Sequence, residues 1–118
     1  MILLLSNAEA GALTLHMSIM RPHFKNLLKS KYRAQKDEYF KSYDYIKSEA
    51  QKQLELELPF YEMHLNIIDV RLLNEFLRAY STKVKGELVK AMQSAKDEQI
   101  DILDELQKRC NELIDDVS

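Results

Sequence analysis

Helix-breaking residues are scarce in this chain, which has only two glycines and two prolines among 118 residues. Apolar residues recur along it at intervals of three and four, the spacing that places side chains on one face of an α-helix. This combination favours long helices over a sheet, which would need many turns. We therefore predict an all-α fold, an antiparallel bundle of three to four long helices in a single domain over residues 1–118.

The first predicted helix begins at Ser6, because the segment Ser6-Asn-Ala-Glu9 has the pattern of a capping box. Apolar residues lie on both of its faces, which is typical of a helix that is buried or that docks onto a partner. Pro22 should end this helix or change its direction, since proline lacks an amide proton and its ring clashes with the preceding turn. The longest uncharged run of the first 20 residues, residues 10–20, is too short to span a membrane. We expect a cytoplasmic protein.

The middle of the chain predicts two more helices. One covers residues 23–57, and a break near residues 34–37 would divide it, because an unbroken helix of this length is long for so small a domain. The next begins at Pro59, since the first turn of a helix tolerates proline. Two alternatives stay open for its end: a turn near residues 81–86, which we favour, or one continuous helix from residue 59 to the tail.

The last third of the chain carries an apolar stripe over residues 88–117 that is close to a heptad repeat. We predict a coiled-coil-like C-terminal helix, and Ser94-x-x-Asp97 is an alternative start for it. The stripe either packs against this chain's own helices or pairs with a second copy or another protein. Together with the first helix it gives the candidate self-association face: Leu13, Met17, Met20, Leu103, Leu106, Cys110, Leu113 and Val117.

Charge is distributed unevenly along the chain, although the net charge is only −2. Residues 21–53 carry nine lysines and arginines against four acidic residues, whereas residues 54–118 carry eight against fourteen. Such runs most often form solvated helix faces. The alternative that implies a specific function is a binding site for a polyanion, in which nearby tyrosines would provide stacking surfaces. The candidate polyanion patch is Arg21, Lys25, Lys29, Lys31, Arg33 and Lys36.

Residues that could carry out catalysis or bind a metal are few and poorly spaced. The three histidines do not occur in E-x-x-H or H-x-x-x-H pairs, and the chain has no glycine-rich phosphate loop. Cys110 is the single cysteine, so it cannot form an intramolecular disulfide, and its place on the apolar stripe indicates a core residue. We expect no cofactor, no metal and no enzymatic activity.

A short segment, His16 with Arg21 and Pro22, resembles the phospho-accepting helix of sensor histidine kinases, although the proline follows the histidine by six residues instead of five. We do not adopt that resemblance as the primary interpretation. The sequence favours a non-catalytic protein-interaction or regulatory module that forms a homodimer or binds another protein. The alternative is a nucleic-acid-associated accessory protein that uses the basic stretch 21–36, and a helical phosphorelay-type regulator is third.

Overall fold

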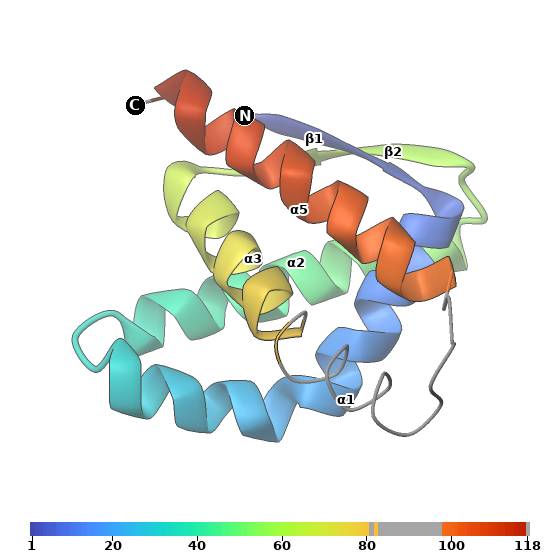
Figure 1. Ribbon diagram of the computed structural model, residues 1–118. Helices are drawn as coiled ribbons and strands as arrows, with labels where there is room; N and C mark the ends of the chain where they lie inside the picture. Colours follow the sequence, from blue (N-terminus) through green and yellow to red (C-terminus); the bar gives the residue numbers. More distant parts are fainter. Residues whose placement is uncertain (81, 83–97, 118) are drawn as a thin grey trace.

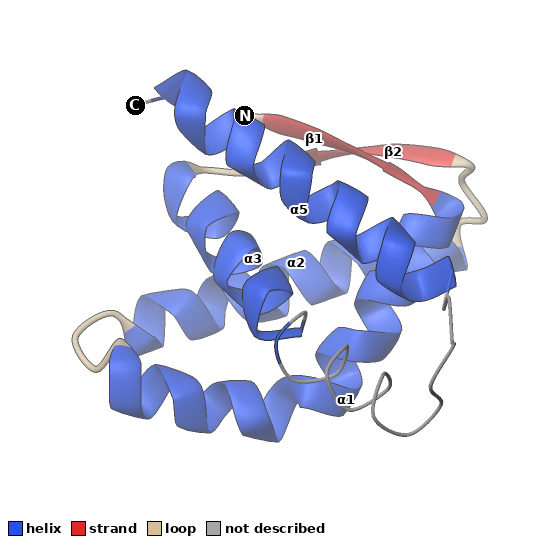
Figure 2. Cartoon of the chain, viewed as in Figure 1, coloured by secondary structure: helices blue, strands red, loops and turns tan. Residues whose placement is uncertain are grey.

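The computed structural model describes residues 1–80, 82 and 98–117, and helices dominate this part of the chain (Figure 1). In chain order the elements are β1 (Ile2–Ser6), α1 (Asn7–Lys31), α2 (Lys36–Glu55), β2 (Phe60–His64), α3 (Ile67–Tyr80) and α5 (Glu98–Val117). The helical character agrees with the prediction. The two short strands were not predicted, and they form a small antiparallel sheet along one side of the molecule, at the top of Figure 2.

The start of α1 is the predicted capping box. Ser6 is the N-cap, and its hydroxyl oxygen accepts a hydrogen bond from the Glu9 amide at 3.2 Å. The Glu9 carboxylate accepts one from the Ser6 amide at 2.9 Å. Two backbone donors at the helix start are thus satisfied by side chains, which fixes the point where β1 gives way to α1.

Pro22 does not end α1, so of the two effects predicted for it the structure shows the change of helix direction (Figure 1). The helix continues through it to Lys31, and its ribbon changes direction near the middle (Figure 1). A proline inside a helix removes one backbone hydrogen bond and is a usual cause of a bend. Met20 and Phe24, on either side of Pro22, are 3% and 0% exposed. Burial of these side chains in the core offsets the lost hydrogen bond, so tertiary packing outweighs local preference here.

The predicted break in the second segment is present, slightly earlier than expected. Residues 32–35 form the turn between α1 and α2, and the Tyr32 amide donates to the Leu28 carbonyl at 3.0 Å as α1 ends. The rings of Tyr32 and Tyr39 meet across this turn with centroids 5.4 Å apart. The two helices consequently form a hairpin, seen at the lower left of Figure 1.

The prediction that a helix starts at Pro59 is wrong. Residues 60–64 are strand β2, which pairs antiparallel with β1 so that Leu3 lies opposite Met63. Both of these side chains point to the core, at 2% and 0% exposure. Such a strand is stabilised by a partner nearly sixty residues away, so local spacing does not reveal it. Leu65 then enters the core as well, at 4% exposure.

Helix α3 begins only at Ile67, where two side chains cap its first turn reciprocally. The Asn66 side-chain oxygen accepts from the Asp69 amide at 2.8 Å, and the Asp69 carboxylate accepts from the Asn66 amide at 3.0 Å. This is the geometry of a capping box built from Asn and Asp. The continuous alternative from residue 59 is wrong at its start, because residues 60–64 are β2. The predicted turn at residues 81–86 and the cap at Ser94 depend on segments outside the described residues.

The core is centred on three aromatic rings from three helices. Phe24 of α1, Tyr43 of α2 and Phe76 of α3 lie with ring centroids 5.4 to 5.7 Å apart, and all three are fully buried. The Tyr43 hydroxyl donates a hydrogen bond to the Met17 carbonyl. This hydrogen bond satisfies the one polar atom of a ring that otherwise packs as an apolar side chain.

Candidate functional site

The predicted self-association face is in the interior of the chain. Leu13, Met17 and Met20 of α1 are 0 to 3% exposed, and so are Leu103, Leu106 and Cys110 of α5. Leu113 is half-buried against the same core, and Val117 ends α5. Within residues 102–114 the stripe therefore packs against this chain's own helices, while residues 88–97 of the stripe lie outside the described residues. The fully buried members of the face offer almost no surface to a second copy.

Cys110 is held as a neutral thiol by this packing. Burial raises the pKa of Cys110 to about 12, although the neighbouring Arg109 opposes the shift. A thiol with so high a pKa stays protonated at neutral pH, whereas a nucleophilic cysteine needs its thiolate. The residue acts here as a small core side chain.

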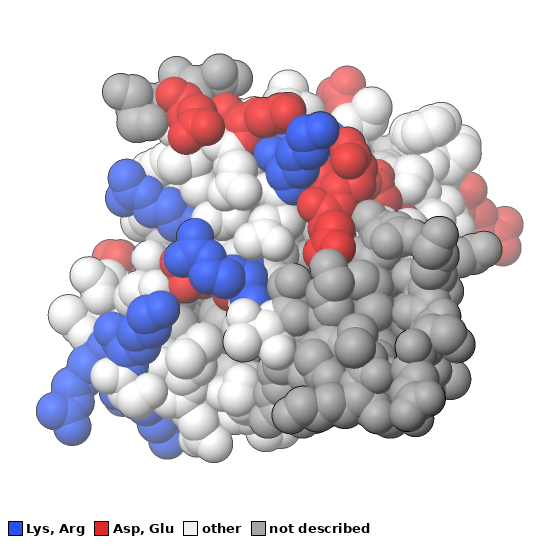
Figure 3. Space-filling model, viewed as in Figure 1, with Lys and Arg blue, Asp and Glu red and all other residues white. Residues whose placement is uncertain are grey.

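The predicted polyanion patch is largely on the surface. Lys25, Lys29, Lys31 and Arg33 are exposed, and Lys36 is half-buried. Figure 3 shows lysine and arginine gathered at the lower left, where α1 and α2 meet, and acidic residues along the top, over α5. Lys25 and Lys29 lie one helical turn apart on α1 and can face the same ligand.

Arg21 and the neighbouring aromatic residues do not extend this basic surface. The Arg21 guanidinium contacts Asp44 at 3.3 Å and lies 5.6 Å from the centroid of the Phe40 ring, so it links α1 to α2. Tyr43 is buried, while Tyr45 is 37% exposed but uses its hydroxyl in a hydrogen bond to the His64 carbonyl at 2.7 Å. The stacking surface expected beside the basic stretch is therefore small.

The histidines lie apart from one another. His16 is 8% exposed and its ring packs edge-on against Tyr80, with centroids 4.6 Å apart. A phospho-accepting histidine must be reached by a phosphate donor, and this burial does not suit that role. His64 is exposed on β2. The described residues contain no group of three histidine, cysteine or acidic side chains placed to hold a metal ion.

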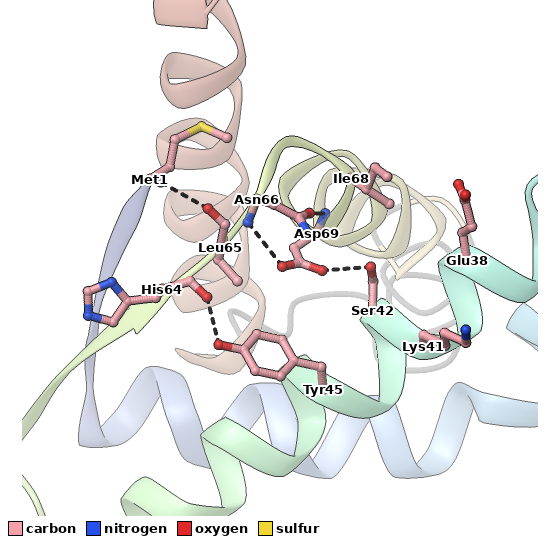
Figure 4. A pocket seen from close by; sticks show the side chains of 10 residues that line it. All are labelled: Met1, Glu38, Lys41, Ser42, Tyr45, His64, Leu65, Asn66, Ile68 and Asp69. Carbon is pink, nitrogen blue, oxygen red and sulfur yellow. Dashed lines mark hydrogen bonds between the residues drawn. The ribbon is translucent and has the colours of Figure 1, made fainter.

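A pocket of about 590 Å³ lies between α2, the start of α3 and the two strands (Figure 4). Ser42, His64 and Asp69 all line it, and these are the residue types of a hydrolytic triad. Their geometry differs from a triad. The Ser42 hydroxyl donates directly to Asp69 at 2.6 Å, and the His64 ring turns away from Ser42 in Figure 4. The neighbour of the serine hydroxyl is thus the Asp69 carboxylate and not the histidine that a triad needs, and this hydrogen bond joins α2 to α3.

A second pocket of about 430 Å³ lies between α1 and α3. Its walls are two stripes of side chains at helical spacing: His23, Leu27 and Lys31 on α1, and Glu75, Arg78, Ala79 and Thr82 along α3 and just after it. We call this pocket the α1/α3 groove.

One end of the α1/α3 groove is polar. The Arg78 guanidinium contacts Glu75 at 3.1 Å, and Glu75 also hydrogen-bonds the Tyr32 hydroxyl. Burial raises the pKa of Tyr32 to about 12, and the hydrogen bond to Glu75 adds to the shift. Tyr32 therefore remains a neutral hydrogen-bond donor to the Glu75 carboxylate. Lys31, with its ammonium 5.6 Å from the Tyr32 ring centroid, lies at the same end.

The outer face of the two-stranded sheet exposes large apolar side chains. Ile2 and Leu4 on β1 are 50% and 49% exposed, and Phe60 on β2 is 64% exposed. We call these three residues the sheet face. Sequence reasoning missed them because residues 1–5 are all apolar, which hides the alternation of inward and outward side chains that identifies a strand.

The two edges of the sheet are partly covered. On β1 the Leu4 carbonyl accepts a hydrogen bond from Arg109 of α5 at 2.6 Å, and Arg109 also pairs with Glu9. On β2 the His64 carbonyl accepts the hydrogen bond from Tyr45. Side chains thus occupy backbone acceptors to which an added strand would bind. The face of the sheet offers more to a partner than its edges do.

Comparison with known proteins gives no match: no protein-family model, curated protein or solved structure is similar to this chain. Among the described residues, no helix combines the length and the apolar character needed to cross a membrane.

Proposed function

We propose that this protein is a non-catalytic interaction module that associates with a second copy of itself through the sheet face. The observation that carries the proposal is the group of three large apolar side chains, Ile2, Leu4 and Phe60, each about half exposed or more on one face of one sheet. Single exposed apolar residues are common on protein surfaces, but adjacent ones indicate a contact site.

The polar residues of the same face support an association between identical surfaces. Glu62 lies opposite Leu4 in the sheet, and His64 lies opposite Ile2. The face therefore combines an apolar centre with one acidic and one basic side chain. A two-fold axis that crosses the strands between these two pairs would bring Glu62 of each copy towards His64 of the other, which is the self-complementarity that a symmetric dimer needs.

The proposed interface replaces the one expected from the apolar stripes. The described apolar residues of those stripes are mostly buried within a single chain, so a coiled-coil contact through α5 would first have to separate α5 from α1 and α3. The sheet face requires no such rearrangement. A role without catalysis is supported by the pocket, where the His64 ring turns away from Ser42 (Figure 4), and by Cys110, whose protonated thiol is not activated as a nucleophile.

Sedimentation velocity over a range of protein concentrations tests the proposal. Leu4→Ser should raise the dimer dissociation constant at least about tenfold, because it removes an apolar side chain from the centre of the contact. The matched control is Ile19→Ser, which makes the same kind of change at a residue of α1 that is 62% exposed. A monomeric wild-type protein, or equal weakening by the two variants, would contradict the sheet face as the interface.

A second candidate function is binding of a nucleic acid by the exposed lysines of the basic stretch. It is favoured by Lys25 and Lys29, which lie one turn apart on an exposed face of α1. Salt separates the two candidates. Binding to a polyanion weakens steeply as the salt concentration rises, whereas association through an apolar face does not.

A further inference from the structure

The direction of α1 and α3 decides which residues lie at each end of the α1/α3 groove. Tyr32 at the end of α1 meets Glu75, and Phe24 contacts Phe76 with ring centroids 5.7 Å apart. Lys31 therefore lies beside the Glu75 end of the groove, while His23 lies nearer Thr82. Leu27 and Ala79 occupy the middle.

The middle and the ends of the groove differ in chemistry. Leu27 and Ala79 are half-buried and supply an apolar floor. At one end Lys31 and Arg78 supply two cationic groups. Among the described lining residues, Glu75 is the acidic side chain, and it accepts hydrogen bonds from one nitrogen of the Arg78 guanidinium, Nη1, and from the Tyr32 hydroxyl.

The positive charge at the groove comes from Lys31 and Arg78. Lys25 and Lys29 are also exposed on α1, but they lie on the face of the helix opposite His23, Leu27 and Lys31. Fixed positive charge around an apolar cleft raises the local concentration of anions. The volume of about 430 Å³ is within the range of roughly 300–1,000 Å³ usual for small-molecule sites.

We propose that the α1/α3 groove binds a small anionic amphiphile, an aliphatic carboxylate whose chain lies on Leu27 and Ala79 and whose carboxylate meets Lys31 and Arg78. The apolar floor excludes a purely polar anion as the best ligand, since such an ion would gain nothing from it. The two cationic groups favour the carboxylate over an uncharged chain of the same length. This site is independent of the sheet face.

Isothermal titration calorimetry with decanoate and decanol tests the proposal, both ligands kept below the concentrations at which they aggregate. Decanoate should bind saturably with one site per chain, and decanol should bind at least about tenfold more weakly, because it lacks the charge-assisted hydrogen bonds. Absence of saturable decanoate binding, or equal affinity for the two ligands, would overturn the proposal.

Two charge variants locate the carboxylate. Lys31→Gln should weaken decanoate binding about fivefold to tenfold, while the control Lys29→Gln, which removes the same charge from the same helix outside the groove lining, should change it less than about twofold. Glu75→Gln should strengthen binding severalfold, since it removes the competing anion and releases Arg78. Equal effects of Lys31→Gln and Lys29→Gln would mean that only general charge attracts the ligand.

Two further variants place the aliphatic chain. Ala79→Phe should fill the middle of the groove and abolish binding of decanoate, with a melting temperature close to that of the wild type as evidence of folding. Leu4→Ser, which alters the sheet face, should leave decanoate affinity unchanged. Loss of decanoate binding in Leu4→Ser would place the ligand on the sheet face and overturn the groove as its site.

Discussion

At the scale of single residues, Asp69 is the clearest case of a polar side chain that organises the fold. It is 8% exposed, and its two carboxylate oxygens accept hydrogen bonds from the Ser42 hydroxyl and the Asn66 amide. One side chain thereby joins α2 to the start of α3. Sequence reasoning assigned it no role, because Ser42 and Asp69 are 27 residues apart and only the fold brings them together.

The exchange of Asp69 for Asn tests this role. Asp69→Asn replaces one acceptor oxygen by an amide nitrogen that cannot accept a hydrogen bond, so either the buried Ser42 hydroxyl or the Asn66 amide loses its acceptor. We expect a loss of roughly 2 kcal/mol in the free energy of unfolding, measured by urea denaturation. The control is Asp44→Asn, which affects an exposed ion pair with Arg21 and should cost less than about 0.5 kcal/mol. Equal losses in the two variants would show that the Ser42–Asp69 hydrogen bond stabilises the fold no more than an exposed ion pair does.

At the scale of elements, the sequence predicts helices well where a local signal starts them. The capping box at Ser6 places the start of α1 correctly, because both partners are three residues apart. The same kind of signal at Asn66 and Asp69 was overlooked, and the prediction placed the helix start at Pro59 instead. The strands were beyond local reasoning, since β1 and β2 stabilise each other across more than fifty residues.

The Asn66 cap gives an element-scale prediction for α3. Asn66→Ala removes the side-chain acceptor of the Asp69 amide and should lower the free energy of unfolding by about 1 kcal/mol in urea denaturation. Asn26→Ala is the matched control, because Asn26 is exposed within α1, where alanine is the better helix former. That control should leave stability unchanged or slightly raised. A cap variant as stable as the wild type would contradict our account of how α3 begins.

At the scale of the whole molecule, the apolar stripes predict which side chains avoid water but not what covers them. Leu13 and Leu106 were candidates for contact with a second copy, and the fold buries both against the chain's own helices. The exposed apolar surface is instead on the sheet, the element that the sequence did not predict. Arg109 illustrates the same limit, since it bridges α5 to the Leu4 carbonyl and to Glu9, more than ninety positions away in each case.

The central claim, association of two copies through the sheet face, is tested most directly by hydrogen–deuterium exchange at low and high protein concentration. We predict that raising the concentration slows exchange in the peptides that contain β1 and β2, because the second copy excludes water from them. Exchange in α5 should not change. Concentration-dependent protection confined to α5, or no dependence in either strand, would contradict the claim.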